Sequence, residues 1–418
     1  MKVLHVNNTD LDGRGFNGYD LMSGLEQLGV TASMVVTDKK SDSPNVVELN
    51  LSGLGRTGRH LLRIGREFTK RTKIRALDEV MLRSRARILA SLPQFREADV
   101  VHYHLIHNDV ISVSDLPWLA GIKPTVWSWH DPWPTTGHCT HPLDCEGWLH
   151  GCAPCPHLDW EFPIERDIAG ALWERKRTAY ARTSAEVLVA SPWMERQARK
   201  SPLVPESMPI HLVPYGLDPS VYLDPALRRD TRRALGIPDD EFVIMFRSTS
   251  NRYKGVGHII EALSSHPPLR PTTIVTVDSV GLIESLAGEY TLKEYGWLRD
   301  RALHYQLLNA ADVFLMPSIG ETFGVMAIEA MAASRPVITF DGTSLREVTG
   351  APDIGISVPL GDSKALREAI DHLAANPAEA TERGMAGREM VLERYTLAKT
   401  AAAHEAVYRQ AIQRFNKR

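Results

Sequence analysis

The residues best suited to chemistry are two glutamates and the short loop that carries the first of them. Glu321 lies in a polar segment that contains a glycine, and Glu329 follows in an apolar pattern of helical spacing. The backbone amides of Thr322, Phe323 and Gly324 come just before that helix, where amides are free to bind an anion. Amides for a diphosphate and carboxylates for sugar and ribose hydroxyls together predict a nucleotide-sugar site.

Apolar runs on both sides of these residues predict the elements that position them. Residues 313–316 form an apolar run closed by a proline, which is typical of the end of a buried strand. The helix that carries Glu329 stops at Arg335-Pro336, and residues 337–340 form the next strand. A strand, loop, helix and strand in this order indicate a parallel sheet, whose carboxyl edge is where open α/β sheets bind ligands.

A second cluster of side chains suited to chemistry is cationic. Arg247 ends an apolar strand pattern, and Arg252 and Lys254 lie in the segment that leads into the following helix. A departing diphosphate needs cations beside it, so these three side chains are candidates for that role. The alternative interpretation is that they are surface charges in a loop.

Length and composition bound the class of protein. At 418 residues and a formal net charge of −3, the chain should form about two or three domains and has no global attraction to nucleic acid. Residues 2–6 predict a strand rather than part of a signal peptide, and no apolar run approaches the roughly 18 residues of a membrane span. We therefore expect a cytoplasmic protein in a reducing compartment.

The segment at residues 56–96 is strongly basic. It contains twelve Lys and Arg residues but three Asp and Glu residues, interleaved with apolar side chains. This pattern predicts an amphipathic helix, or a pair of helices, that contacts a membrane surface or an acidic acceptor. The alternative is a solvated helical face over an ordinary core.

All four cysteines lie within one short block. Cys152 and Cys155 form a C-x2-C pair, and Cys139 and Cys145 precede them with a looser spacing. Four thiolates in this span could close a tetrahedral structural zinc site. The alternatives are small buried side chains or a local disulfide. We do not expect a catalytic zinc, because four thiolates would leave no open position.

These motifs resemble those of retaining glycosyltransferases of family 4, which have the GT-B fold. Glu321 and Glu329 occupy the two positions of the E-x7-E signature, and Lys254 followed by glycine fits the cationic loop. The resemblance implies that the Glu321 region contacts the donor sugar and that Glu329 holds the ribose. It also implies that Lys254 binds the diphosphate together with Arg247 or Arg252. A threonine stands where the family has its arginine, so the choice between those two stays open.

Motifs in the N-terminal half extend the resemblance to a subset of bacterial family-4 enzymes that build exopolysaccharides. His130 ends a strand and is followed by the block of cysteines and histidines, as in that subset. The resemblance implies that His130 points at the donor sugar and that Gly13 and Gly15 reach the donor phosphate. The alternatives are a histidine capped by local backbone and glycines that only make a turn. Trp297 and Leu298 resemble a turn whose backbone lies against the nucleotide base.

The resemblance covers nearly the whole chain and implies an α/β fold of the GT-B kind, with two Rossmann-like domains facing a cleft. The acceptor-side domain would comprise residues 1–206, with a Cys/His-rich insertion at 138–157. The nucleotide-sugar-binding domain would comprise residues 207–396. The C-terminal helix, residues 397–418, would cross back onto the first domain.

The resemblance also implies the activity. We expect retaining transfer of a sugar from a nucleotide diphosphate sugar, UDP- or GDP-linked, to a hydroxyl of a glycan, glycolipid or small-molecule acceptor in polysaccharide or glycoconjugate biosynthesis. His130, Glu321 and Lys254 are the expected catalytic residues, and a lipid-phosphate acceptor would account for the basic segment. Asp10 and Asp12 form a D-x-D, the metal motif of the other large glycosyltransferase class. In this chain the D-x-D lies directly after the first strand, which is the wrong context for a metal site. We therefore interpret it as incidental and expect no catalytic metal.

Two alternatives from other classes remain at this point. The chain could be a nucleotide-sugar epimerase or a phosphorylase with the same fold, or a non-catalytic, zinc-stabilised nucleotide-binding protein. An epimerase would act on the donor without an acceptor, and a binding protein would show metal and nucleotide but no turnover.

Overall fold

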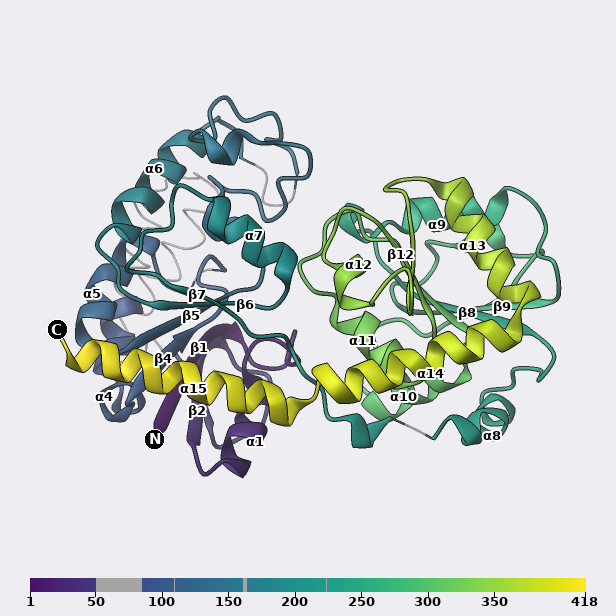
Figure 1. Ribbon diagram of the computed structural model, residues 1–418, viewed down its shortest axis with the longest axis horizontal. Helices are drawn as coiled ribbons and strands as arrows, with labels where there is room; N and C mark the ends of the chain where they lie inside the picture. Colours follow the sequence, from purple (N-terminus) through teal and green to yellow (C-terminus); the bar gives the residue numbers. More distant parts are fainter. Residues whose placement is uncertain (50–84, 109, 161–163, 223) are drawn as a thin grey trace, which may run out of the picture. The chain divides into compact units, whose positions relative to one another are not determined.

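The computed structural model describes residues 1–49, 85–108, 110–160, 164–222 and 224–418. The chain forms two compact units, each built around one parallel sheet (Figure 1). Unit 1 comprises Met1–Ala190, Met194–Val213 and Leu397–Arg418, and unit 2 comprises Ser191–Trp193 and Pro214–Thr396.

The described part of unit 1 contains a seven-stranded sheet in the order β3-β2-β1-β4-β5-β6-β7. Its strands are β1 (Lys2–Thr9), β2 (Thr31–Asp38), β3 (Val46–Glu48), β4 (Val100–Tyr103), β5 (Thr125–Trp129), β6 (Glu186–Val189) and β7 (Ile210–Leu212). The helices of this half are α1 (Tyr19–Gln27), α4 (Pro93–Glu97), α5 (Leu116–Ile122), α6 (Ala169–Tyr180) and α7 (Pro192–Lys200). The strand order changes direction between β1 and β4, which is the topological switch point of this sheet.

The last helix of the chain, α15 (Leu397–Asn416), completes unit 1. It packs against α1, β4 and β5, and Figure 1 shows it as the yellow helix that runs across these strands. Ala401, Tyr408 and Ala411 recur at helical spacing and are buried in one apolar cluster with α1 and the sheet. The contact with α1 is close, because a Cβ added at Gly24 would lie 3.0 Å from the Ala401 Cβ. The helices α1 and α15 therefore cover the same face of the sheet.

Unit 2 contains a six-stranded parallel sheet in the order β10-β9-β8-β11-β12-β13. Its strands are β8 (Phe242–Ser248), β9 (Thr272–Asp278), β10 (Thr291–Glu294), β11 (Val313–Met316), β12 (Val337–Phe340) and β13 (Ile356–Val358). Its helices are α8 (Arg228–Ala234), α9 (Val256–Ser264), α10 (Arg301–Ala310), α11 (Val325–Ala332), α12 (Leu345–Val348), α13 (Ser363–Ala375) and α14 (Pro377–Arg394). The switch point of this sheet lies between β8 and β11.

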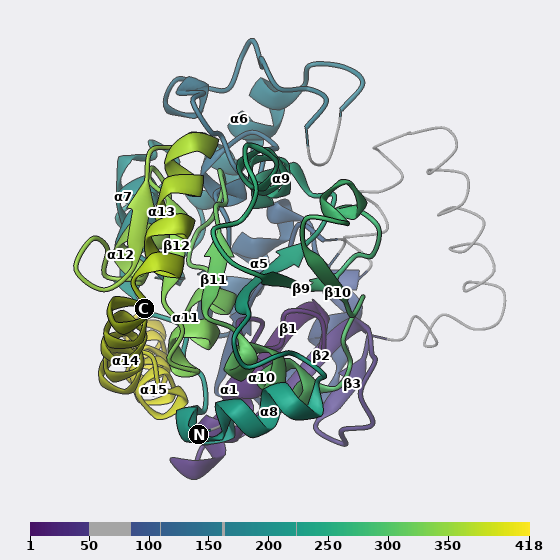
Figure 2. The same cartoon turned by 90° about the vertical axis from the view of Figure 1, so that its right-hand side faces the viewer.

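Helices cover both faces of the unit 2 sheet, which explains why its central strands β8 and β11 are largely apolar. Phe242, Ile244 and Phe246 alternate along β8 and pack with α9 and α13 on one face. On the other face α11 packs against α14 (Figures 1 and 2). Side chains alternate between the two faces along each strand, and the charged Arg247 and Asp278 lie at the carboxyl ends of β8 and β9.

Most of the basic segment predicted to contact a membrane, residues 56–84, lies outside the described residues. In its described remainder Ala86 and Leu89 are buried, and α4 begins at a proline. Within the ranges that the structure describes, no helix combines the length and the apolar character needed to cross a bilayer. Contact with a membrane surface stays a prediction.

Candidate functional site

Two loops of unit 2 meet at the carboxyl ends of the neighbouring strands β8 and β11. The loop after β8 carries Lys254, and the loop after β11 carries Glu321. Lys254 Nζ lies 2.7 Å from Glu321 Oε2, and the two side chains are 25% and 13% exposed. The two residues predicted to be catalytic in this half therefore form one ion pair at the switch point, where open α/β sheets bind ligands.

Glycines in the left-handed region start the helices that follow both loops. Gly255 (φ 70°) precedes α9, and Gly324 (φ 90°) precedes α11. A Cβ at these positions would lie 1.9 Å from the Pro317 carbonyl oxygen and 2.4 Å from Leu345 Cδ2, so neither site accommodates a side chain. Neither helix start has a capping side chain. Both helices thus present backbone amides and the positive end of the helix dipole to an anion.

Hydrogen bonds tie the two loops into one unit. The Ile319 amide donates to the Tyr253 carbonyl over 2.8 Å, which joins the Glu321 loop to the Lys254 loop. Glu321 Oε1 also accepts from the Thr322 amide at 3.1 Å. The Glu321 carboxylate is therefore held by a cation on one oxygen and by a backbone amide on the other.

The ring of Phe323 anchors the loop. It is buried and packs edge-to-face against Tyr215 and Tyr395, with ring centroids 4.9 Å and 5.5 Å away. The adjacent Thr322 is buried as well, and its carbonyl accepts a hydrogen bond of 2.5 Å from the Ser191 hydroxyl. The side chains of both residues are buried in these contacts, and anion binding by their amides stays a prediction.

Glu329 lies in the second turn of α11, where its Oε2 is 3.3 Å from His304 Nε2 of α10. Both side chains are mostly buried, at 17% and 15% exposure. The sequence predicted Glu329 but missed His304. The start of α10 can be read from its capping residue Asp300, yet nothing local connects the histidine to a glutamate on another helix.

The structure separates the two arginines that were left as alternatives. Arg247 extends from β8 and pairs through its Nε with Asp278 Oδ2 at 2.7 Å. Arg252 is exposed at the start of the 3-10 turn Arg252–Lys254, close in sequence to the ammonium that it would assist. Arg247 already has a carboxylate partner, so Arg252 is the better candidate to join Lys254. Which of them binds the diphosphate stays a prediction.

The predicted base-binding turn lies after β10. Trp297 is 60% exposed and Leu298 is half-buried. The Asp278 amide donates to the Gly296 carbonyl at 2.7 Å, which ties this segment to the end of β9. The exposed indole offers a flat apolar surface, and its contact with a base stays a prediction.

In unit 1 a row of histidines crosses the switch point between β1 and β4. His5 of β1 lies in register with His102 of β4, and His104 follows that strand. His5 Nδ1 lies 3.0 Å from His104 Nε2, and His104 Nδ1 lies 3.0 Å from Nε2 of His130, which follows β5. His130, the predicted sugar-orienting residue, is thus the outer end of a hydrogen-bonded chain of three imidazoles.

The imidazoles of this row are neutral at ordinary pH. Burial lowers the pKa of His5 and of His130 to about 3 and that of His404 on α15 to about 4. Burial and the neighbouring imidazoles hold the pKa values of His102 and His104 well below the usual range. A neutral imidazole has one N–H donor and one acceptor nitrogen, so the chain from His5 to His130 has a direction set by its tautomers.

The same row contains a group that could hold a metal. Among the described residues, His5, His102 and His104 are the one group of three or more His, Cys, Asp or Glu side chains whose ligand atoms all lie within 4.8 Å of one another. Both nitrogens of His102 are bonded already, to Ser128 Oγ at 2.7 Å and to Tyr408 Oη at 2.8 Å. Both nitrogens of His104 are bonded to other imidazoles, whereas the buried Nε2 of His5 has no hydrogen-bond partner among the described residues.

The glycine loop after β1 packs on this row. A Cβ at Gly13 (φ 71°) would lie 2.3 Å from Phe16 Cζ, and the Phe16 ring lies 5.2 Å from that of His130. A Cβ at Gly18 would lie 2.6 Å from His5 Nδ1. The close approach of Phe16 and His5 leaves no room for a Cβ at Gly13 or Gly18. Contact of Gly13 and Gly15 with a phosphate stays a prediction.

The four cysteines are free thiols. Burial raises the pKa of Cys139 to about 11 and that of Cys152 to about 12, and other thiols of the block add to both shifts. The Gly137 amide donates to Cys152 Sγ at 3.1 Å, and His138 Nε2 lies 3.4 Å from Cys155 Sγ. The sulfurs are near one another but do not form a group with mutual distances within 4.8 Å. A zinc site at Cys139, Cys145, Cys152 and Cys155 stays a prediction.

Lys176 on α6 is a buried cation that the sequence interpretation missed. Its ammonium donates to the carbonyl oxygens of Trp133 at 2.5 Å and of Thr136 at 2.8 Å, and it lies 3.5 Å from the centroid of the Trp133 ring. Burial lowers its pKa to about 7. The lysine holds the segment that joins His130 to the cysteine block. No sequence motif marks it, because its partners are backbone carbonyls on another element.

The geometry of unit 2 agrees with a family comparison. Residues 228–390, which include Lys254, Glu321 and Glu329, match the model of the glycosyl transferases group 1. This part of the chain is therefore similar to the glycosyl transferases group 1. The match begins at α8 and ends within α14, so it contains both helix starts at the switch point.

Relatives with similar sequences include a sugar-phosphate synthase and a glycosyltransferase. Alpha-maltose-1-phosphate synthase of Mycolicibacterium smegmatis is 28% identical over 257 residues, which is 56% of this chain and 65% of that protein. D-inositol 3-phosphate glycosyltransferase of Xylanimonas cellulosilytica is 30% identical over 219 residues, or 49% of this chain and 52% of that protein. The chain thus matches less than two thirds of the length of either relative.

Solved structures extend the likeness to the whole chain. Sucrose-phosphate synthase from Thermosynechococcus elongatus has a TM-score of 0.70 and 20% identity, with 99% of this chain and 100% of that one covered. Anabaena HepE in complex with UDP-glucose has a TM-score of 0.62 and 15% identity, with both chains covered completely. At these identities the likeness shows the fold. The prediction of an α/β fold with two Rossmann-like domains is confirmed.

Proposed function

We propose that this chain is a retaining glycosyltransferase of family 4 type, which moves a sugar from a nucleoside diphosphate sugar to a hydroxyl acceptor. The ion pair of Lys254 and Glu321 at the switch point between β8 and β11 carries the proposal. It lies between two helix starts whose glycines allow an anion to approach the backbone. A related fold has been solved with UDP-glucose, which supports a nucleotide sugar as the donor class.

Donor binding would exchange the partners of this ion pair. A diphosphate carries more negative charge than one carboxylate, so it would take Lys254 from Glu321. The released Glu321 carboxylate could then accept a hydrogen bond from a sugar hydroxyl. Lys254, Arg252 or Arg247, and the amides near Gly324 would stabilise the negative charge that grows on the departing diphosphate.

The other predicted residues complete the mechanism. Glu329 would accept hydrogen bonds from the ribose hydroxyls, with His304 fixing its carboxylate. His130 would orient the sugar as a neutral imidazole, since burial lowers its pKa to about 3. The acceptor would attack on the face that the diphosphate leaves, so the chemistry needs no pair of carboxylates of the glycosidase type.

Thermal-shift measurements with UDP-, GDP- and dTDP-sugars test the donor. One of these ligands should raise the midpoint of unfolding in a concentration-dependent way, because it binds the native chain. Lys254→Ala should lose most of the shift, whereas Lys364→Ala should keep it. Lys364 is a suitable control because it lies on α13 of the same unit with an 88% exposed side chain. Equal shifts in both variants would contradict the proposed diphosphate site.

Incubation of the enzyme with donor, with and without acceptor, tests the reaction class. A glycosyltransferase should release nucleoside diphosphate much faster when an acceptor hydroxyl is present, and NMR of the product should show the anomeric configuration of the donor. Conversion of the donor sugar without an acceptor would instead identify an epimerase. An inverted anomeric centre would contradict the retaining mechanism.

A further inference from the structure

The amino edge of the unit 2 sheet contains a second site of interest. A cavity of about 360 Å³ lies there, at the starts of β8 and β12 and beside the first turn of α14. The strands separate this edge from the Lys254–Glu321 pair by about 13 Å, the length of a four-residue strand. The charged side chains that line the cavity are Arg228, Arg232, Arg270, Arg335, Asp239, Glu241 and Asp312.

One arginine of this group has a structural role. Arg232 is 2% exposed and donates to Asp312 Oδ2 at 2.7 Å and to the carbonyls of Ala310 and Glu241, both at 2.9 Å. Asp312 Oδ2 also accepts from the Val243 amide at 2.8 Å. These contacts fix α8 to the edge of the sheet and leave no donor of Arg232 in need of a ligand.

Other donors around the cavity are not satisfied. Arg228 binds Asp312 through its Nη2, but its Nε is buried and has no hydrogen-bond partner among the described residues. The hydroxyl of Ser334, a residue 5% exposed, is in the same state. Arg335 is 8% exposed and uses Nε and Nη1 for the carbonyls of Ala333 and Ala311, which leaves its Nη2 over. Arg228 Nε and the Ser334 hydroxyl are buried donors without partners, which is costly, so these two indicate a ligand that the cavity is built to hold.

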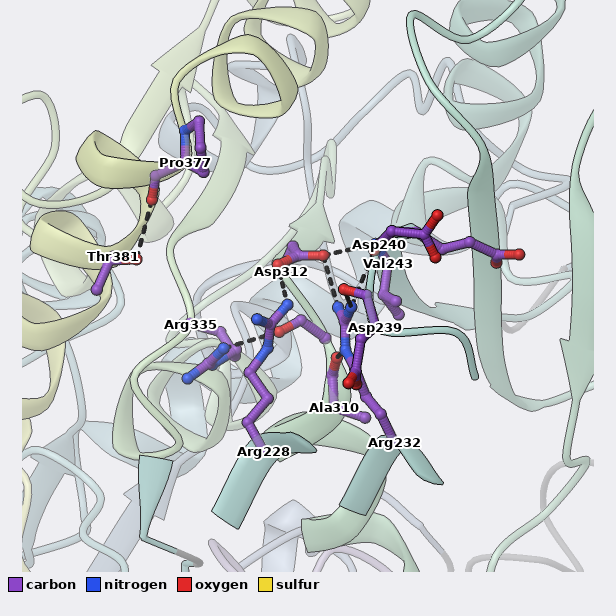
Figure 3. Close-up of polar contacts among 12 residues, drawn as sticks. Arg228, Arg232, Asp239, Asp240, Val243, Ala310, Asp312, Arg335, Pro377 and Thr381 are labelled. Atoms are coloured by element: carbon purple, nitrogen blue, oxygen red, sulfur yellow. Dashed lines mark hydrogen bonds and ion pairs between the residues drawn. The ribbon is translucent and has the colours of Figure 1, made fainter. Parts of the chain in front are cut away.

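The electrostatics of the cavity favour an anion. Figure 3 shows the guanidinium groups of Arg228 and Arg335 beside each other, with Asp312 above them. Pro377 and Thr381 of α14 lie toward the upper left of the same view. Burial and the charge of Arg228 lower the pKa of Arg335 to about 10. Four arginines face three acidic side chains in the lining, so one positive charge is left over. The start of α14, an 18-residue helix without a capping side chain, adds its positive dipole end.

We propose that this cavity binds a phosphate group, either free orthophosphate or the phosphate of a small monoester, through Arg228, Ser334 and Arg335. A phosphate offers several strong acceptor oxygens in different directions, as the two guanidinium groups and the hydroxyl require. A planar carboxylate would satisfy fewer of these donors. The site lies apart from the proposed donor site, so the proposal does not depend on the proposed reaction.

Calorimetric titration of the full chain with orthophosphate and with glucose 6-phosphate tests the proposal. Ser334→Gly is the most informative variant. Ser334 has a φ of 60°, which glycine adopts more readily than serine, so the variant should unfold at the same temperature or higher. It should nevertheless bind phosphate about tenfold more weakly, because a hydroxyl donor to a charged oxygen is lost. Arg228→Gln should weaken binding by a similar or larger factor.

Two controls make the result decisive. Arg233→Gln removes a guanidinium from the same helix, but Arg233 is 77% exposed and pairs with Asp230, so phosphate affinity should not change. Lys254→Ala should also leave it unchanged, which separates this cavity from a diphosphate site. Tighter binding of orthophosphate than of the monoester would identify the free ion as the ligand, and the reverse order would identify a phosphorylated metabolite. Absence of binding at about 10 mM, or an affinity in Ser334→Gly and Arg228→Gln that equals that of the parent protein, would overturn the proposal.

Discussion

Lys254 Nζ and Glu321 Oε2 lie 2.7 Å apart, although sequence resemblance assigns one to the diphosphate and the other to the sugar of a donor. In the absence of a donor each side chain neutralises the other. The pair lies at the point where chain order reverses in the unit 2 sheet, between two helix starts. Because the two side chains are paired, neither charge is left without a counterion at a partly buried position. Binding of a donor would then have to break this ion pair, so that Lys254 could contact the diphosphate and Glu321 the sugar.

This exchange predicts opposite effects of one substitution on binding and on turnover. Glu321→Gln removes the carboxylate that competes for Lys254, so nucleoside diphosphate without a sugar should bind roughly three- to tenfold more tightly. Sugar transfer should fall by about two orders of magnitude, because the amide lacks the charge that orients the sugar. Calorimetry with the free nucleotide and steady-state kinetics measure the two effects. Weaker nucleotide binding in Glu321→Gln would show that the carboxylate does not compete for the lysine.

Glu329 is expected to act on the ribose, and a change of ligand can isolate that contact. Glu329→Gln should weaken binding of the nucleoside diphosphate by about tenfold, because a charged hydrogen bond to a hydroxyl is lost. The 2′,3′-dideoxy nucleotide should bind the parent protein and Glu329→Gln equally well. His304→Leu should show the same pattern with a smaller effect, since His304 fixes the carboxylate. A loss that is equally large for the dideoxy nucleotide would assign Glu329 a structural role.

The contact between His104 and His130 predicts a positioning role in catalysis. His104→Leu removes the partner of His130 Nε2, so the His130 ring should sample both tautomers and more than one orientation. We expect kcat to fall by about tenfold while KM for the donor changes little. His104→Gln, whose amide can still donate, should recover part of the loss. Nitrogen NMR of the imidazoles should show one dominant His130 tautomer in the parent protein and a mixture in His104→Leu.

Five histidines with a lowered pKa, His5, His102, His104, His130 and His404, predict a steep acid limit of stability. Their native pKa values lie well below the usual value of about 6.5, so between pH 6.5 and 4 the unfolded chain binds more protons than the native one. The free energy of unfolding should therefore fall as the pH falls below 6.5, by up to about 1.4 kcal/mol per pH unit for each histidine. Above pH 7 the free energy of unfolding should rise further, because burial lowers the pKa of Lys176 to about 7 and the unfolded lysine stays protonated.

Urea titrations at pH 7.5, 6.5 and 5.5 measure this slope. The window above pH 5 avoids most of the titration of carboxylates, whose unfolded pKa values lie near 4. His404→Leu removes one of the buried imidazoles, so unfolding should take up one proton fewer. The free energy of unfolding of this variant should therefore change less steeply with pH. A free energy that does not change between pH 6.5 and 5.5 would show that the histidines are protonated in the native state.

The cysteine block makes a prediction about metal content. If its thiols bind zinc, metal analysis should find about one zinc per chain, and chelation should lower the midpoint of unfolding. Cys152→Ser should lose the metal, whereas replacement of the exposed His150 by alanine should keep it. Without zinc, burial keeps the pKa of Cys139 near 11, so its thiol should react slowly with alkylating agents at pH 7.5. If the protein contains no zinc and chelation leaves the midpoint of unfolding unchanged, the cysteines are buried, protonated thiols without a metal.

Local patterns in the sequence were enough to predict the elements that hold the candidate site of unit 2. The apolar run of β11, the glycine before α11 and the Arg335-Pro336 stop all act through neighbouring residues, and the predicted strand and helix are where these patterns put them. Lys254 and Glu321 could be placed at one sheet edge because parallel strands share that edge. Their direct pairing could not be predicted, since it depends on the path of two loops.

Contacts between distant segments account for what the sequence did not reveal. His102 and Tyr408 are bonded although 306 positions separate them, and Arg228 reaches an aspartate 84 positions away. Such pairs leave no spacing pattern, because each partner sits in an element that forms for its own reasons. The unsatisfied hydroxyl of Ser334 is a further case, since a serine next to Arg335 looks like an ordinary helix end until the surrounding elements are in place.

The position of α15 in unit 1 has a consequence for biosynthesis. The face of the first sheet that this helix covers stays open until α15 has been translated and has packed onto it, since Ala401, Tyr408 and Ala411 belong to its apolar cluster. Unit 2 is made of residues translated earlier, and it can reach its native state first. We therefore expect unit 2 to complete its fold before unit 1 does, which is the reverse of the usual order from the amino terminus onward. During that interval the nascent first domain exposes a row of histidines and an apolar surface that a chaperone could bind.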